Sequence, residues 1–418
     1  MLPIQILVNS MTKNNIKKMK LNIKNFLINP KTILLLYLCL TIIVTAQSIL
    51  SGSKKFEKCT LGYKESTREY THYNNYIIFK QSYFHLKEGK DLYKYYLEEH
   101  ADLYKYTPSF AIFMGILAYF PDFIGLCLWN LLNAIILFLA IKYIPSLTMK
   151  NKCLILLFIL VELVTSMRNS QSNGLITGLI ILTFVFLERN QYFLASLSIV
   201  LCIFIKIFGI VAFVIFLFYP KKLKLLLYTL LCFVGVFSLP LLVVNFEQLK
   251  ILYSSWFSLL SQDHAVNYGY SVMGLLKIWF NVEIPKNIIV LVGIFLFCLP
   301  LIRIKQYQNF HFRLLTLSSV LIWVVIFNHK AESPTFIIAV TGVATWFFSQ
   351  EMKKENLTLL FIAFIFTSLS PTDIFPRFIK DQFFLPYLIK VVPCILIWLK
   401  IIYEMTLLQF KPELNSGI

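Results

Sequence analysis

Acidic side chains concentrate in one segment of the sequence. Residues 51–108 hold eight of the 21 carboxylates of the chain: Glu57, Glu65, Glu69, Glu88, Asp91, Glu98, Glu99 and Asp102. A positioned carboxylate can take a proton from a hydroxyl group, so this enrichment is compatible with general-base catalysis. A polar loop also needs charge to be solvated, which is the simpler explanation for any single member of the set.

Two charged residues, Glu162 and Lys206, stand within long apolar runs. Ionisable groups at membrane depth are costly and usually face a cavity or pair with each other, so one expectation is a Glu162–Lys206 pair. The other is that Lys206 binds an anionic phosphate together with Arg168. The polar string at 167–173 (MRNSQSN) adds side-chain amides that suit a phosphate or a sugar.

A second polar turn, at 328–332 (NHKAE), carries His329, which can donate to phosphate or move a proton. A solvated turn is the alternative. The sequence contains no HxxxH pair, DxD-type carboxylate pair, GxxxxGK[ST] loop or GxSxG elbow. We therefore expect no metal site, no cofactor and no ATP-driven chemistry on the cytoplasmic side.

The composition excludes a soluble enzyme. Charged residues make up 14% of the 418 residues and hydrophobic residues 58%, whereas soluble domains carry about 25% charged residues. The net charge of +18 comes from basic residues scattered between apolar runs, so it predicts membrane orientation rather than nucleic-acid binding. The eight cysteines form no CxxC pair, and seven of them lie in apolar runs.

Apolar runs and the basic loops between them predict an all-α bundle of about twelve membrane spans with both termini cytoplasmic. Residues 109–120 are too short to cross, and 193–219 must break into two short helices near Lys206 to keep the basic loops inside. The predicted spans are roughly 32–50, 122–143, 152–167, 171–188, 191–205, 207–220, 225–244, 286–302, 314–328, 334–349, 357–371 and 386–404.

This topology divides the chain into five parts. They are a basic cytoplasmic N-terminus (1–31), a first transmembrane helix (32–50), an extracytoplasmic loop (51–121), a transmembrane bundle (122–404) and a cytoplasmic tail (405–418). Within the loop, a stripe of Tyr76, Phe79, Tyr83 and Leu86 at helical spacing predicts a helix lying on the bilayer surface. Residues 109–120 would form a second such helix.

Several strings in this order resemble glycosyltransferase family 87, a member of the GT-C superfamily. They are 89–93 (GKDLY), 104–110 (YKYTPSF), 128–133 (LWNLLN) and 168–173 (RNSQSN), which is similar to the R-x-G-Q-x-N turn of that family. The similarity extends over about residues 30–345. It implies a metal-independent membrane hexosyltransferase, typically a mannosyltransferase, with an acidic catalytic base in the first outer loop.

The sequence departs from the family pattern at two positions. Asn75 stands where the family usually has an aspartate, and an amide cannot take a proton. Ser170 replaces the glycine of the turn. The catalytic position is therefore assigned to Asn75, with Glu69 and Asp102 as carboxylates that could take over the role. The expected substrate-binding residues are Tyr106, Arg168, Gln171, Asn173, Lys206, Asn328 and His329.

The resulting expectation is transfer of a hexose, with inversion, from a polyprenyl-phosphate donor to a glycan or glycolipid hydroxyl. The reaction would take place at the outer face of a bacterial plasma membrane, with the lipid bilayer, the donor and the acceptor as partners and no nucleic acid. Two alternatives remain open, namely a polytopic transporter or flippase of lipid-linked sugars and a catalytically silent family member. Substrate movement without covalent change would identify the flippase.

Overall fold

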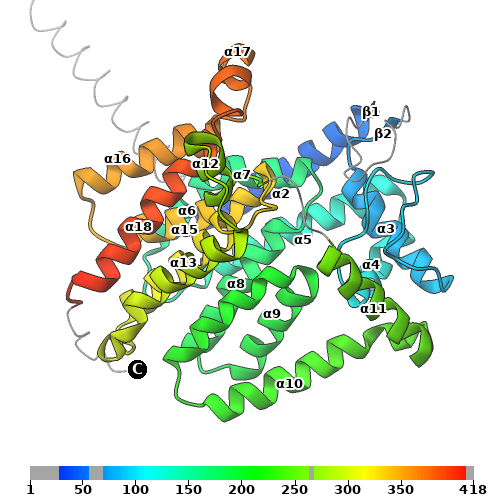
Figure 1. The fold of residues 1–418 in the computed structure, drawn as a ribbon, viewed down its shortest axis with the longest axis horizontal. Helices are drawn as coiled ribbons and strands as arrows, with labels where there is room; N and C mark the ends of the chain where they lie inside the picture. Colours follow the sequence, from blue (N-terminus) through cyan, green and yellow to red (C-terminus); the bar gives the residue numbers. More distant parts are fainter. Residues whose placement is uncertain (1–27, 56–68, 263–267, 411–418) are drawn as a thin grey trace, which may run out of the picture.

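The computed structural model describes residues 28–55, 69–262 and 268–410 of the chain, and these are helical nearly throughout (Figure 1). Three predictions lie outside these residues: the basic N-terminal arm as far as residue 27, Cys59 in the polar loop, and the end of the C-terminal tail. Glu57 and Glu65 of the acidic set also lie outside them.

The described part of the segment 51–121, which the sequence predicts to be the first outer loop, forms a small subdomain at one end of the molecule (Figure 1). Strands β1 (Ser53–Lys55) and β2 (Glu69–Thr71) pair antiparallel, with Lys54 opposite Tyr70. Helix α3 (Asn74–Lys87) then packs against α4 (Pro108–Ala118), which starts at a proline behind the side-chain cap of Thr107. Proline fits the first turn of a helix because its missing N–H would have no partner there.

The bundle begins with elements near the predicted spans. They are α2 (Pro30–Leu50), α5 (Asp122–Lys142), α6 (Met149–Phe158), α7 (Leu160–Arg168), α8 (Asn173–Glu188), α9 (Tyr192–Ile205), the 3₁₀ helix η1 (Ile207–Phe218), α10 (Lys222–Ser238) and η2 (Leu239–Leu242). Lys206 has an extended backbone between α9 and η1. The predicted division of 193–219 into two short helices at Lys206 is therefore confirmed.

The second half of the chain is more interrupted. It contains α11 (Phe246–Gln262), α12 (Val272–Phe280), α13 (Lys286–Cys298), η3 (Leu299–Ile302), η4 (Ile304–Gln306), α14 (Phe310–Ile326), η5 (Ser333–Thr335), α15 (Phe336–Phe348), α16 (Lys354–Ala363), η6 (Phe364–Leu369), α17 (Arg377–Ile379), η7 (Lys380–Phe384), η8 (Ile389–Val391) and α18 (Val392–Leu407). Helices α11 and α12 lie in the segment 245–285, between the predicted spans 225–244 and 286–302.

The core lies where consecutive helices pack in pairs. Helix α5 contacts α2 and α8, α8 contacts α9 and α15, and α14 contacts α15 and α18. Helices α8, α14 and α15 are buried along almost their whole length, whereas α10 exposes a row of leucines along one side and runs at the edge of the bundle (Figure 1). A helix that stays apolar on its exposed face suits a lipid environment.

Within the described residues, three helices are long and apolar enough to cross a membrane: Pro30–Leu50, Asp122–Lys142 and Lys222–Leu242. The pair Arg377–Phe384 and Ile389–Leu407, bent by 77°, would be a fourth if it counts as one span. Seven further apolar helices have 10–17 residues. The chain thus has the character of a membrane protein, and the count of twelve spans stays a prediction.

The predicted Glu162–Lys206 pair is wrong. The Glu162 carboxylate lies 2.6 Å from the ammonium of Lys390, and both side chains are almost fully buried. The pattern of apolar runs singles out Glu162 and Lys206 and does not include Lys390. Fold topology brings Lys390, 228 residues further along the chain, next to α7.

The prediction that α3 lies on the bilayer through its aromatic stripe is also wrong. Tyr76, Phe79 and Leu86 are buried inside the protein, and the Phe79 ring meets the rings of Phe110 and Trp129 edge to face. The stripe therefore docks the outer loop onto α4 and α5. The exposed apolar side chains of this region lie on and after α4 instead: Ile116, Tyr119, Phe120, Phe123 and Ile124.

The buried ion pair generates the first prediction. Lys390→Met alone leaves a buried carboxylate without its cation, which costs about 3–5 kcal/mol, whereas Glu162→Leu with Lys390→Met removes both charges and restores much of the loss. Thermal unfolding in detergent measures the two variants. Lys250→Met, which breaks an exposed pair with Glu247, is the control and should change stability little. A double variant less stable than the single one would contradict this account.

Candidate functional site

The turn between α7 and α8 is held by the string LWNLLN on α5. The indole N–H of Trp129 donates to the Ser170 carbonyl at 3.0 Å, and the Asn133 side-chain oxygen accepts from the Leu175 backbone N–H at 2.8 Å. Ser170 has a φ of +51°, the left-handed region that glycine adopts without strain. The turn thus keeps a glycine-type backbone at the position where the family pattern has glycine.

Lys206 points into this turn. Its ammonium nitrogen lies 2.8 Å from Asn173 Oδ1 and 3.5 Å from Gln171 Oε1, and 5.9 Å from the centre of the Tyr106 ring. Within the described residues, Lys206 forms no ion pair with a carboxylate. The amide oxygens solvate the ammonium without neutralising its charge, so the cation can still attract an anion.

Glu332 completes this arrangement from the start of η5, which packs against α7. Its Oε2 accepts from Gln171 Nε2 at 2.8 Å, and Asn173 Nδ2 donates to the Pro334 carbonyl at 2.9 Å. The side chain is exposed and stands immediately before the short helix η5. The residues expected from the sequence at this site did not include Glu332. The available signal was an acid directly before a Ser-Pro-Thr helix start, where a carboxylate is favoured.

The string YKYTPSF brings the outer loop to the same place. The Tyr106 hydroxyl lies 3.3 Å from the Ser172 hydroxyl, and Thr107 Oγ1 donates to the Phe204 carbonyl at 2.5 Å, two residues before Lys206. Tyr93 of the GKDLY string donates through its hydroxyl to the Tyr106 carbonyl at 3.0 Å. These bonds fix the loop over the break between α9 and η1.

The three residues assigned to the catalytic position have different surroundings. Asn75 donates from Nδ2 to the Asn169 carbonyl at 2.8 Å, so it clamps α3 to the turn. Glu69 lies in the hairpin, where Ser53 Oγ donates to it at 2.6 Å. Asp102 accepts from the Lys105 ammonium at 3.0 Å, and its side chain is 44% exposed. Of the two carboxylates, Asp102 belongs to the loop that covers Lys206.

Charges gather around Asp102. Burial and the nearby Lys105 lower the pKa of Lys330 to about 8, while the Asp102 carboxylate opposes that shift. Burial opposes the charged form of Lys105, but the carboxylates of Asp102 and Glu332 outweigh it and raise the pKa of Lys105. The segments 102–105 and 330–332 therefore lie within electrostatic reach of each other, beside the turn that holds Lys206.

The remaining predicted binding residues, Arg168, Asn328 and His329, lie beside the turn that holds Lys206. Arg168 is exposed. The pKa of His72 is lowered mainly by burial, then by the charge of Lys54, and then by the charge of Arg168. Asn328 uses its side-chain oxygen to accept from the Lys330 backbone N–H at 2.9 Å, which stabilises its own turn. The backbone of half-buried His329 packs against Gly269. The structure thus joins Asn75, Tyr106, Gln171, Asn173 and Lys206 in one connected arrangement, which does not include the side chains of Arg168 and Asn328.

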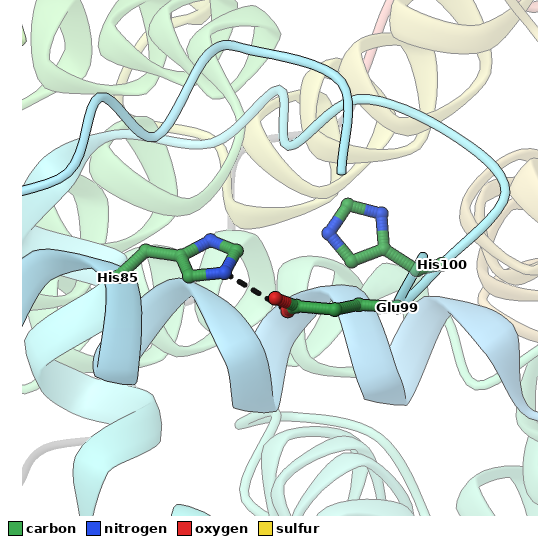
Figure 2. A group of neighbouring side chains, drawn as sticks. All are labelled: His85, Glu99 and His100. Atoms are coloured by element: carbon green, nitrogen blue, oxygen red, sulfur yellow. Dashed lines mark hydrogen bonds and ion pairs between the residues drawn. The ribbon is translucent and has the colours of Figure 1, made fainter. Parts of the chain in front are cut away.

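Within the described residues, one group of side chains has the composition of a metal site. His85 of α3 lies beside Glu99 and His100 (Figure 2), with His85 Nε2 2.9 Å from Glu99 Oε2. Burial lowers the pKa of both histidines, and the nearby Glu99 carboxylate opposes this shift. No HxxxH spacing connects them, which is why the sequence interpretation expected no metal.

The strained turn generates the second prediction. Ser170 pays for a left-handed backbone, and its buried hydroxyl has no hydrogen-bond partner among the described residues. Ser170→Gly removes both costs, so the free energy of unfolding should rise by about 1 kcal/mol, measured as a higher midpoint of thermal unfolding. Ser166→Gly, one turn earlier in the ordinary α-helix α7, should lower it by about 1 kcal/mol. A loss of stability in both variants would contradict the strain assignment.

Comparison with known proteins agrees with this arrangement of strings and turns. The family model of glycosyltransferase family 87 matches residues 104–371, more than half of the chain, including the YKYTPSF and LWNLLN strings, the 168–173 turn, Lys206 and Glu332. No curated protein matches the chain significantly. The resemblance expected from the sequence is thereby confirmed: the chain belongs to glycosyltransferase family 87, a family of membrane glycosyltransferases.

Proposed function

We propose that the protein transfers a hexose, mannose being the first candidate, from a polyprenyl-phosphate donor to an acceptor hydroxyl at the outer face of the plasma membrane. The observation that carries this proposal is the Lys206 ammonium, which is solvated by amide oxygens and unpaired with any described carboxylate. Such a cation suits the phosphate of a lipid-linked sugar, because that phosphate is the leaving group of the reaction.

Lys206 would act on charge that develops during the reaction. As the bond between the anomeric carbon and the phosphate oxygen breaks, negative charge grows on the phosphate, and a fixed ammonium in a poorly solvated site stabilises it. Asn173 holds the ammonium in place before the reaction starts. Gln171 links this end of the site to Glu332, so cation and carboxylate keep a constant relative position.

The acceptor hydroxyl would be activated by a carboxylate on the face of the anomeric carbon opposite the phosphate. Asp102 and Glu332 both qualify, because each has an exposed side chain beside the covered break. Glu332 accepts from the neutral side-chain amide of Gln171, whereas the Asp102 carboxylate is engaged by the Lys105 ammonium. We therefore assign the role of the base to Glu332, and Asp102 is the second candidate.

The proposed step is a single inverting displacement. The acceptor hydroxyl gives its proton to the carboxylate while its oxygen forms a bond to the anomeric carbon. The bond from that carbon to the phosphate oxygen breaks at the same time, and the bond electrons leave with polyprenyl phosphate. The carboxylic acid formed on the protein then releases its proton to water.

Transfer of radiolabelled mannose from polyprenyl-phosphate-mannose in proteoliposomes tests the proposal. Lys206→Ala should lower the rate about 10²–10³-fold through loss of electrostatic stabilisation. Glu332→Gln should lower it about 10²–10⁴-fold through loss of the base, and Asp102→Asn should lower it less. Lys250→Ala, at an exposed ion pair far along the chain, is the control and should leave the rate unchanged.

Each other result has a defined meaning. Undiminished transfer by Lys206→Ala would remove that residue from the mechanism. Equal losses for Glu332→Gln and Asp102→Asn would overturn the choice between the two carboxylates. Movement of the lipid-linked sugar across the bilayer without covalent change would replace the transferase proposal by the flippase alternative, and absence of both activities with a panel of hexose donors would support a silent family member.

A further inference from the structure

We propose that His85, Glu99 and His100 form a binding site for a divalent transition-metal ion, with zinc as the first candidate. One ligand atom from each residue lies within 4.8 Å of the other two. His85 comes from the last turn of α3, and Glu99 and His100 are neighbours in the segment that returns toward Asn74 (Figure 2). The proposal does not depend on the transferase reaction.

The spacing of the three ligand atoms is close to what a tetrahedral ion needs. Zinc binds nitrogen and oxygen ligands at about 2.0–2.2 Å, which places two tetrahedral ligand atoms roughly 3.3–3.6 Å apart. His85 Nε2–H donates to Glu99 Oε2 at 2.9 Å; an ion would replace this proton, which leaves to water, and the two atoms would separate around the ion. The three ligand atoms lie within 4.8 Å of one another, so they would have to move closer by about 1 Å to bind one ion. Side-chain rotation can supply such a movement.

The hydrogen bond of His100 prepares its ring for a metal. Nδ1 lies 2.7 Å from the Asp102 carbonyl, and because a carbonyl can only accept, Nδ1 must carry the proton. Nε2 then keeps its lone pair, and Figure 2 shows the second ring nitrogen of His100 on the side that faces His85. Ligating histidines usually fix their tautomer in this way, by donating the other N–H to a carbonyl or carboxylate.

The surroundings also suit a bound ion. The side chain of His85 is 4% exposed and lies against the Tyr96 ring at a centroid distance of 3.9 Å, with the two ring planes tilted by 35°, while the side chain of Glu99 is 32% exposed. The ion would enter from the side of Glu99 and keep a water molecule in its fourth position. Two imidazoles and one carboxylate favour zinc over calcium or magnesium, which prefer oxygen ligands alone.

An ordinary hydrogen bond between His85 and Glu99 accounts for only two of the three residues. It does not explain why a second buried histidine, with its tautomer fixed by Asp102, lies beside the same carboxylate. A metal would tie α3 to the segment that leads into Asp102. It would therefore act as a structural staple for the loop that covers Lys206, rather than as a participant in the reaction.

Zinc binding by the full chain in detergent micelles tests this site. After treatment with a chelator, the protein is titrated with zinc chloride, desalted and measured for zinc content and thermal unfolding. The wild type should retain one zinc per chain, and its unfolding temperature should rise with zinc concentration, because ligand binding stabilises the folded state. Cobalt(II) in place of zinc should give the intense visible absorption of a tetrahedral site.

Glu99→Gln is the diagnostic variant, because glutamine can still accept a hydrogen bond from His85 but is a poor metal ligand. We expect it to bind zinc at least about tenfold more weakly and to lose the cobalt spectrum, while its metal-free unfolding temperature stays close to that of the wild type. His72→Gln, a histidine of the same loop outside the group, should bind zinc like the wild type.

His100→Gln is the second variant and should lose zinc in the same way. It replaces Glu99→Gln as the test if that variant fails to fold. The proposal is overturned if the wild type retains no stoichiometric zinc. It is equally overturned if Glu99→Gln, His100→Gln and His72→Gln all bind zinc with the affinity of the wild type, because the metal would then be held elsewhere.

Discussion

The candidate site depends on one interaction, the hydrogen bond from the Lys206 ammonium to the Asn173 side chain at 2.8 Å. Lys206 stands at the break between α9 and η1, and Asn173 begins α8, so the bond joins two helix ends that would otherwise be free. The same asparagine donates to the Pro334 carbonyl before α15. Three neighbouring helix termini thus meet around a single cation.

The two departures from the family pattern are consistent with this arrangement. Asn75 donates to the Asn169 carbonyl, which an ionised aspartate could not do, because a carboxylate only accepts. Ser170, the next residue, keeps the left-handed backbone that the family obtains with glycine. The turn therefore keeps its shape through the hydrogen bonds from Asn75 of α3 and from Trp129. Because position 75 carries an amide, the proposed base is the carboxylate of Glu332.

Local features of the fold could be predicted from the sequence. The break at Lys206 followed from run lengths and basic loops. The choice of Tyr106, Gln171, Asn173 and Lys206 as site residues followed from the polar turn and from the short strings that resemble the family. The Glu162–Lys390 pair and the His85–Glu99–His100 group could not be predicted in the same way. Each joins residues through tertiary packing, and neither has a regular spacing in the sequence.

The error over α3 has a different cause. A stripe of aromatic residues at helical spacing predicts an apolar face but does not say whether lipid or protein covers it. Here α4 and Trp129 cover it, and the exposed apolar side chains lie after α4 instead. The outer loop is consequently packed onto the bundle through its own core, which gives Tyr106 and Asp102 defined positions near the break.

The central claim is that the Lys206 ammonium binds the phosphate of a lipid-linked sugar. The most direct measurement is a cryo-electron microscopy structure of the protein in lipid nanodiscs with a non-hydrolysable polyprenyl-phosphonate sugar. We expect the phosphonate at about 3 Å from Lys206 Nζ, with the sugar toward Glu332 and the lipid chain along the apolar surface. A phosphonate bound away from Lys206, with the Lys206–Asn173 bond unchanged, would contradict the account.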